Sequence, residues 1–201
     1  MKTYFSYPKL RELAFVLPPL IQFRMQIWVA VRLALGHLPA PPDRVLEIGA
    51  ATGWLSRRLA RALPRSRVEA LDLSAAMIRA AQQTPHPPNL FFRVGDMFAL
   101  PEDPVYDLVV SAHTWMLLPP EQAFPHLHAM LHPEGVALLT LTFPGLFTRM
   151  HRAFFERVSG GRLRLHPPDW WCAQAEPWFE TRLFPVHEGE PSGLLWLKKR
   201  A

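Results

Sequence analysis

The sequence predicts an α/β domain built on a doubly wound, mostly parallel seven-stranded sheet with an antiparallel last strand. From Arg44 onward, short apolar runs alternate with helical stretches, which is the pattern of strands joined by crossover helices. Some strand candidates are apolar on both faces, as in Leu138–Leu141, which is typical of a sheet covered on both sides. The chain has 201 residues, 49% hydrophobic and 19% charged, so it can bury the core of one domain.

Seven short segments have the composition of strands. The last two enclose a turn rich in glycine, proline and serine, which predicts an antiparallel hairpin at the edge of the parallel sheet. The predicted strands are Val45–Ile48, Val68–Leu71, Leu90–Val94, Tyr106–Ser111, Val136–Phe143, Phe179–Val186 and Leu194–Lys198.

Helical patterns occupy most of the connections. A helix over Leu20–Leu35 begins after Pro19 and ends at Gly36. The segment after Gly161 is expected to form a loop rich in arginine, histidine and tryptophan. Further helices are predicted over Trp54–Leu63, Ala75–Gln83, Glu121–Leu131 and Gly145–Val158.

Residues 1–42 form a predicted helical N-terminal extension. Arg24, Trp28 and Arg32 lie on one face of its helix. That face either packs on the domain or lies at an interface, as an active-site cover or in weak contact with a membrane surface. The apolar run Leu13–Phe23 is shorter than the ~20 residues that span a bilayer, so no membrane span is expected.

Composition also bounds the compartment and the partners. Cys172 is the single cysteine, which excludes an internal disulfide and a cysteine-based zinc site and favours a cytoplasmic location. The 22 prolines and the lone Asn89 are typical of a thermophilic source, although a GC-rich genome alone would also enrich proline, arginine and alanine. The net charge of +5 comes from the two ends of the chain, because residues 43–143 are slightly acidic. The ends either meet an anionic partner or form a solvated arginine-rich surface.

The segment Val45–Gly53 carries the clearest chemistry. It runs from a strand through a glycine-containing turn into a helix, which lets the backbone approach a ligand at a helix N-terminus. Asp72 ends the next strand, where a carboxylate can accept hydrogen bonds from ribose hydroxyls. A nucleoside-containing cofactor is therefore predicted. Trp54 stands where the dinucleotide fingerprint needs its third glycine, which argues against a nicotinamide cofactor and an oxidoreductase.

Five motifs in order resemble those of the class I S-adenosylmethionine (SAM)-dependent methyltransferases. Their first motif, E/D-x-G-x-G-x-G, corresponds to Glu47–Gly53, with Ala51 at the middle glycine. Asp72 matches the acidic position after the second strand. The remaining matches are Gly95–Met97, Tyr106–His113 and Leu131–Gly135, the last with Glu134 at a glycine position.

This resemblance implies a Rossmann-like fold, SAM as cofactor and S-adenosylhomocysteine as product. It divides a single methyltransferase domain into the 1–42 extension, a SAM-binding core over 43–143, a helical substrate-side insert over 144–177 and a C-terminal strand hairpin over 178–201. Related small enzymes fold an N-terminal segment over the cofactor, so Tyr4, Phe5 and Tyr7 either belong to such a lid or pack elsewhere.

The resemblance also implies the cofactor contacts. Asp72 would meet the ribose, Met77 would pack on the adenine and Asp96 would accept from its amino group, while Ala51 is expected to narrow the space slightly. The full implied set is Glu47, Gly49, Ala50, Ala51, Gly53, Asp72, Leu73, Met77, Gly95, Asp96, Met97 and Ser111.

His113 is the candidate catalytic residue, because it follows the fourth strand at the mouth of the predicted site. It either acts as a general base near neutral pH or lines the pocket. His128 and His132 are four residues apart, but no carboxylate or cysteine nearby completes a metal site, so no metal is expected.

The insert combines basic and aromatic residues, which either bind a lipid headgroup, a nucleic acid or an acidic metabolite, or form an amphipathic cover. Phe143, Phe147, Phe154 and Phe155 favour an amphiphilic acceptor beneath it. The residues concerned are Arg149, His151, Arg152, Arg157, Arg162, Arg164, His166, Trp170, Trp171 and Trp178.

The predicted function is methyl transfer from SAM to a small-molecule or lipid acceptor. The alternatives are an RNA or protein methyltransferase and a SAM-binding module without catalysis. Ser111–Thr114 lacks the N-P-P-Y pattern of amino-group nucleic-acid methylation, and a lone cysteine excludes the cysteine pair used on pyrimidine carbon. No specific nucleic-acid partner is therefore expected.

Overall fold

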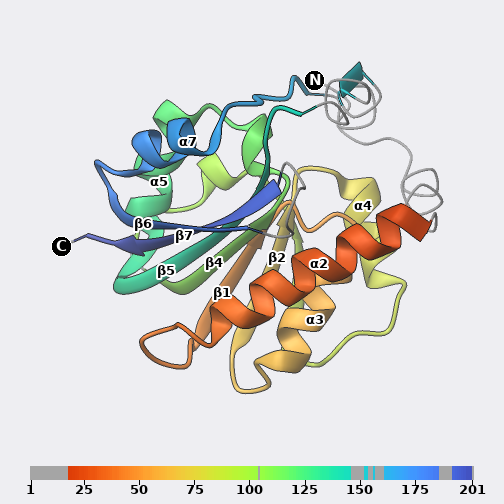
Figure 1. Ribbon diagram of the computed structural model, residues 1–201. Helices are drawn as coiled ribbons and strands as arrows, with labels where there is room; N and C mark the ends of the chain where they lie inside the picture. The colour runs from red at the N-terminus through yellow and green to blue at the C-terminus, as the bar shows by residue number, and fades with distance from the viewer. Residues whose placement is uncertain are drawn as a thin grey trace.

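One mixed sheet organises the protein, and the computed structural model describes residues 18–103, 105–145, 152–153, 156, 161–185 and 192–200. Seven strands lie in the order β3-β2-β1-β4-β5-β7-β6 (Figure 1). Strands β1 to β5 are parallel, and β7 runs antiparallel to its neighbours, which confirms the predicted fold class. The strands are β1 Arg44–Ile48, β2 Arg67–Asp72, β3 Leu90–Val94, β4 Tyr106–Ala112, β5 Leu131–Thr142, β6 Phe179–Pro185 and β7 Ser192–Lys199.

The sequence pattern suggested that the antiparallel strand lies at the edge of the sheet, but in the structure it lies inside the sheet. β7 lies between β5 and β6, so the edge strand is β6 and runs in the same direction as β5. The reason is burial on both faces of β7: Trp196 packs into one core cluster and Leu195 into the other. In β6, Glu180 and Arg182 are exposed, which suits a strand with one open side.

Helices cover both faces of the sheet. On one face lie α2 (Pro18–Leu35) and α3 (Trp54–Ala62), with α4 (Ala75–Gln82) beside α3 (Figure 1). The other face carries α5 (Pro120–Met130), α7 (Pro168–Ala175) and the short 3₁₀ turns η1 (Met97–Ala99) and η2 (Trp115–Leu117).

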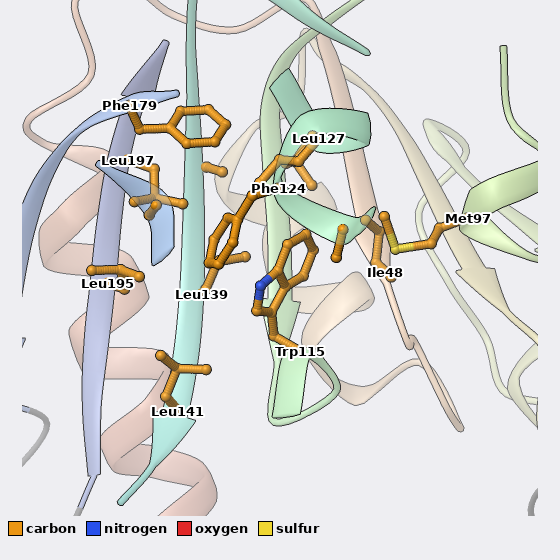
Figure 2. Close-up of a cluster of buried hydrophobic side chains, with 14 of the residues drawn as sticks. Ile48, Met97, Trp115, Phe124, Leu127, Leu139, Leu141, Phe179, Leu195 and Leu197 are labelled. Atoms are coloured by element: carbon orange, nitrogen blue, oxygen red, sulfur yellow. The ribbon is translucent and has the colours of Figure 1, made fainter. Parts of the chain in front are cut away.

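Alternation along the strands divides the core into two clusters. In β1, Val45 faces α2 and α3, whereas Leu46 faces the opposite layer. Figure 2 shows the second layer, in which Trp115 and Phe124 pack against the aliphatic side chains of β5 and β7. Their ring centroids are 5.4 Å apart. Burial on both faces explains why the strands read as continuous apolar runs.

The structure corrects two predicted elements. Residues 168–175 form α7 rather than a loop, because Pro167 and Pro168 start a helix whose Trp171 and Ala175 are completely buried. β5 begins at Leu131, earlier than predicted, and includes the segment expected to form a turn.

The other predicted helices are present with small shifts at their ends. The helix expected over Gly145–Val158 lies mostly outside the described residues, of which 152, 153 and 156 are helical. In the described part of the chain, no helix is long and apolar enough to cross a membrane.

Candidate cofactor and acceptor site

The carboxyl ends of β1 to β4 meet at one edge of the sheet, where hydrogen bonds tie their loops together. The Gly49 N–H donates to the Leu71 carbonyl over 2.8 Å, and the Gly95 N–H donates to the Asp72 carbonyl over 3.0 Å. The Ser111 hydroxyl donates to the carbonyl that ends β1 over 3.1 Å. The structure therefore brings together the four segments that the sequence singled out.

The loop after β1 has an unusual backbone. Gly49, Ala51 and Gly53 have φ angles of +79°, +51° and +75°. A Cβ atom at Gly49 would lie 2.6 Å from the Thr114 Cβ, and one at Gly53 would lie 2.6 Å from the Phe92 ring. These two glycines are therefore required by neighbouring side chains as well as by the backbone. Sequence reasoning gave no sign of either contact, since both join distant segments.

Asp72 holds this loop from the end of β2. One carboxylate oxygen accepts from the Ala51 N–H over 2.7 Å, and the other accepts from the Ser74 N–H over 2.8 Å. Charge-assisted hydrogen bonds of this kind are strong. A carboxylate at the end of the second strand is the type of group that accepts hydrogen bonds from ribose hydroxyls.

A buried contact of Glu47 supports the glycine loop from beneath, and the predicted cofactor contact of Glu47 stays a prediction. Its carboxylate is buried and accepts a hydrogen bond from the Ser56 hydroxyl in the first turn of α3. This contact fixes α3 against β1 immediately beneath the loop. Ser56 was not among the predicted site residues, because no spacing rule connects it to Glu47.

The chemistry beside Asp72 fits a purine nucleoside. Leu73 and Val94 are each 48% exposed at the ends of adjacent strands, which gives a planar base an apolar surface. Asp96 is exposed, and one of its oxygens accepts from the Phe98 N–H over 3.0 Å. Its second oxygen can accept from an amino group. The residues at this edge therefore suit the adenosine part of SAM.

Three implied contact residues lie behind the site surface. Met77 is completely buried, and Met97 is 3% exposed and packs near Ile48 and Trp115 (Figure 2). Ala51 is only 5% exposed, so its methyl group does not occupy open cofactor space. The contact of Met77 with adenine stays a prediction.

His113 lies at the end of β4 in a strained conformation. Its φ of +54° is uncommon for a residue with a side chain, and such strain clusters at functional sites. The backbone N–H donates to the Thr140 carbonyl over 3.1 Å, and Nδ1 is hydrogen-bonded to the Thr142 hydroxyl at 3.0 Å. β5 thus fixes both the backbone and the ring of His113.

In the described part of the insert, basic and aromatic side chains contact the rest of the domain and one another. Arg164 donates through its backbone N–H and its guanidinium to the carbonyls of Met116 and Leu117, over 2.9 and 3.0 Å. His166 stacks on Trp170 with the ring centroids 3.7 Å apart. Of the two alternatives left open for the insert, a ligand-binding surface and an amphipathic cover, the complete burial of Trp171 in the core favours the cover for that residue.

Several predicted residues lie outside the described part of the chain. They are Tyr4, Phe5, Tyr7, Phe147, Arg149, His151, Phe154, Phe155 and Arg157. Within the described ranges, no three His, Cys, Asp or Glu side chains form a group that could hold a metal ion. His128 donates to the Arg200 carbonyl over 3.2 Å and packs against the Trp178 ring.

Comparison with known proteins agrees with this geometry. A family described as "Methyltransferase domain" matches residues 45–135. A malonyl-[acyl-carrier protein] O-methyltransferase of Bacillus cytotoxicus is 30% identical over 147 residues, which cover 73% of this chain and 52% of that protein. The protein of the same name from Geobacter sulfurreducens is 34% identical over 132 residues, or 62% of this chain and 49% of that protein. The chain thus spans about half the length of the curated relatives it matches.

Among solved structures, the SAM-dependent methyltransferase SibL superposes with a TM-score of 0.70 at 21% sequence identity. The match covers 98% of this chain and 60% of SibL, and at this identity it establishes the fold alone. The strand order, the glycine loop after β1, the carboxylate after β2 and the matched family domain lead to one assignment. Residues 45–135 match a methyltransferase-domain family, and the chain has the fold of the class I SAM-dependent methyltransferases.

Proposed function

We propose that the protein is a SAM-dependent O-methyltransferase that acts on the free carboxylate of a malonyl group held as a thioester by an acyl carrier protein. The observation that carries this proposal is the identity of about 30% with relatives of that name. The fold alone is compatible with many acceptors, so the acceptor rests on these relatives. A malonyl group falls within the small-molecule or lipid acceptors that the sequence led us to expect, and the carrier protein would hold it as a thioester.

The cofactor contacts form part of the same proposal. Asp72 binds the ribose hydroxyls, Leu73 contacts a face of the adenine, and Asp96 accepts from the adenine amino group. The remaining positions shape the loops around the cofactor. They are Glu47, Gly49, Ala50, Ala51, Gly53, Met77, Gly95, Met97 and Ser111.

The mechanism follows from the acceptor. SAM, when bound, supplies a methyl group activated by a positively charged sulfur. A carboxylic acid is ionised at neutral pH, so no base has to remove a proton. The protein therefore has to align the carboxylate oxygen with the methyl group and exclude water. We assign this alignment to His113. Its Nδ1 is hydrogen-bonded to the Thr142 hydroxyl, and we propose that its Nε2 contacts the acceptor oxygen.

The test is a methylation assay with the purified full chain. SAM is supplied with malonyl-carrier protein or with a malonyl thioester of N-acetylcysteamine, and the methyl ester is identified by mass spectrometry. An acetyl thioester, which has no free carboxylate, is the matched negative control. Tight SAM binding without methylation of either malonyl thioester would contradict the proposal and identify a SAM-binding module.

The pH profile tests the assignment of His113. For an ionised acceptor, kcat should not fall as the pH drops through the usual titration range of histidine. A loss of rate there that His113→Gln removes would show that His113 acts as a base. That result would point to an acceptor that carries a proton, such as a hydroxyl.

Location and source complete the proposal. We infer a cytoplasmic enzyme, because the single cysteine, Cys172, is a free thiol. The proline-rich and asparagine-poor composition supports a thermophilic source.

A further inference from the structure

The outer surface of α2 carries a stripe of exposed apolar side chains. Met25, Val29 and Leu33 are 42%, 52% and 67% exposed. Their four-residue spacing places them along one side of the helix. Single exposed apolar residues are ordinary, but three in line on one helix form a patch that a partner can cover.

Arginines of two helices adjoin this stripe. Arg24 of α2 and Arg58 of α3 both lie over the Trp54 ring, 5.4 and 4.0 Å from its centroid. The Arg58 guanidinium is also 3.9 Å from the Met25 sulfur. Trp54 directly follows Gly53, so the two arginines lie over the residue that adjoins the glycine loop. Figure 1 shows α2 lying outside the sheet next to α3.

The segment of the sequence that contains α2 and α3 is basic. Between residues 18 and 66 the chain has seven arginines and two acidic residues, Asp43 and Glu47, neither of which lies in α2 or α3. Burial and the nearby Arg61 lower the pKa of Arg58. Arginines held this close repel one another, and an anionic partner would relieve that repulsion.

We propose that this surface docks an acidic protein domain, namely the carrier that delivers the tethered acceptor. We name it the α2–α3 patch. Its stripe would pack against an apolar helix face of the carrier, and its arginines would pair with carboxylates around that face. Its residues are Arg24, Met25, Val29, Arg32, Leu33, Arg58 and Arg61. The inference rests on the proposed function, because only a carrier-linked acceptor requires a docking site beside the cofactor loop.

A binding measurement tests the patch without any turnover. An acidic acyl carrier protein, labelled with a fluorophore, is titrated with the full chain, and fluorescence anisotropy is recorded at low and at physiological salt. Arg32→Glu/Arg61→Glu should weaken binding at least about tenfold, and salt should weaken binding to the wild type. Arg79→Glu is the matched control and should change affinity less than about twofold. All three arginines are exposed and lie in the last turn of a helix.

Kinetics then separate docking from catalysis. In the double variant, kcat/KM should fall about tenfold for the carrier-linked malonyl group. For the N-acetylcysteamine thioester, kcat/KM should stay unchanged. Methylation of neither substrate by the wild type would contradict the proposed function, whereas the anisotropy result would still decide whether the patch binds the carrier. Equal carrier binding by wild type and double variant would overturn the docking proposal.

Two other occupants would also overturn it. If the patch variants lose binding to vesicles containing phosphatidylglycerol but keep carrier affinity, the patch is a membrane-contact surface. If sedimentation shows a wild-type dimer that the variants convert to monomers, the patch is a self-association surface. Leu33→Ser, which removes an exposed apolar side chain and no charge, provides a second variant in each assay and should weaken carrier binding about threefold.

Discussion

Gly49→Ala tests the geometry of the glycine loop most directly. The new methyl group would lie 2.6 and 2.7 Å from the Cβ and Cγ2 atoms of Thr114, far inside van der Waals contact. Overpacking of this kind costs about 1–3 kcal/mol. The φ of +79° adds about 1–2 kcal/mol for a residue with a Cβ atom. We therefore expect Gly49→Ala to lower the free energy of unfolding by about 2–5 kcal/mol.

Urea denaturation of a double-mutant cycle measures the steric part. Thr114→Ala removes the Cγ2 and Oγ1 atoms, so the double variant should recover about 1–2 kcal/mol relative to simple addition. The backbone part should persist. Gly36→Ala is the matched control, because its Cβ would meet only the Leu33 carbonyl at 3.2 Å, and Gly36 has no positive φ.

Two results would refute this reasoning. One is a Gly49→Ala variant as stable as Gly36→Ala. The other is strict additivity with Thr114→Ala, which would mean that the two residues do not touch. SAM affinity, measured by calorimetry on the same variants, should fall with Gly49→Ala, since the loop has to move to admit the methyl group.

Three further predictions follow from contacts in the structure. Asp72→Asn replaces one of two accepting oxygens with a donor, so it should cost about 1.5–3 kcal/mol in urea unfolding and at least about tenfold in SAM affinity; a change in affinity alone would show that Asp72 does not hold the loop. His126→Ala should destabilise by about 1–3 kcal/mol, since its ring is buried and bonded to the Met97 carbonyl at 2.8 Å. Glu102 is exposed and contacts the other ring nitrogen of His126, so Glu102→Gln should cost less than about 0.5 kcal/mol, and equal losses would contradict this account. Burial, with Asp169 and Glu176 as smaller contributions, raises the pKa of the Cys172 thiol, so less thiolate is present at a given pH. Iodoacetamide should therefore alkylate Cys172 more slowly at pH 8 than it alkylates the cysteine of a short unstructured peptide. Equal rates, measured by mass spectrometry, would contradict this.

The sheet could be predicted because its signals are local. Each parallel strand of the core is a short apolar run bounded by turn residues, and burial on both faces made those runs conspicuous. The end of β2 could be predicted at Asp72 because a charged residue follows the apolar run there. The helix α7 was missed because its stability is tertiary: Trp171 and Ala175 contribute core contacts that no periodic pattern announced.

The start of β5 depended on a distant partner. Tyr106 pairs with Leu131, and Leu108 pairs with Val136, so β4 advances two residues while β5 advances five. The extra residues of β5 form an irregularity within the strand, and sequence reasoning interpreted them as a turn outside it. Pairing with β4 extends the strand across this irregularity, and only the fold reveals that pairing.

The candidate site divides along the same line. Residues that follow strand ends, such as Asp72, Asp96 and His113, were found from their position in the pattern. Thr114, Ser56 and Thr142 were not, because each acts through a contact between segments far apart in sequence. Positions on the site surface are therefore predictable from local signals, whereas the side chains that support them are not.

Ala51 shows how a departure from the motif can be accommodated. The family pattern has glycine there, and the left-handed φ of +51° costs a residue with a side chain about 1–2 kcal/mol. The Ala51 N–H donates to the buried Asp72 carboxylate over 2.7 Å, and such a bond contributes about 1.5–3 kcal/mol. The bond therefore offsets the strain, and Ala51 is buried. Asp72 thus has two roles, since the carboxylate proposed to bind ribose also stabilises the conformation that an alanine would otherwise disfavour.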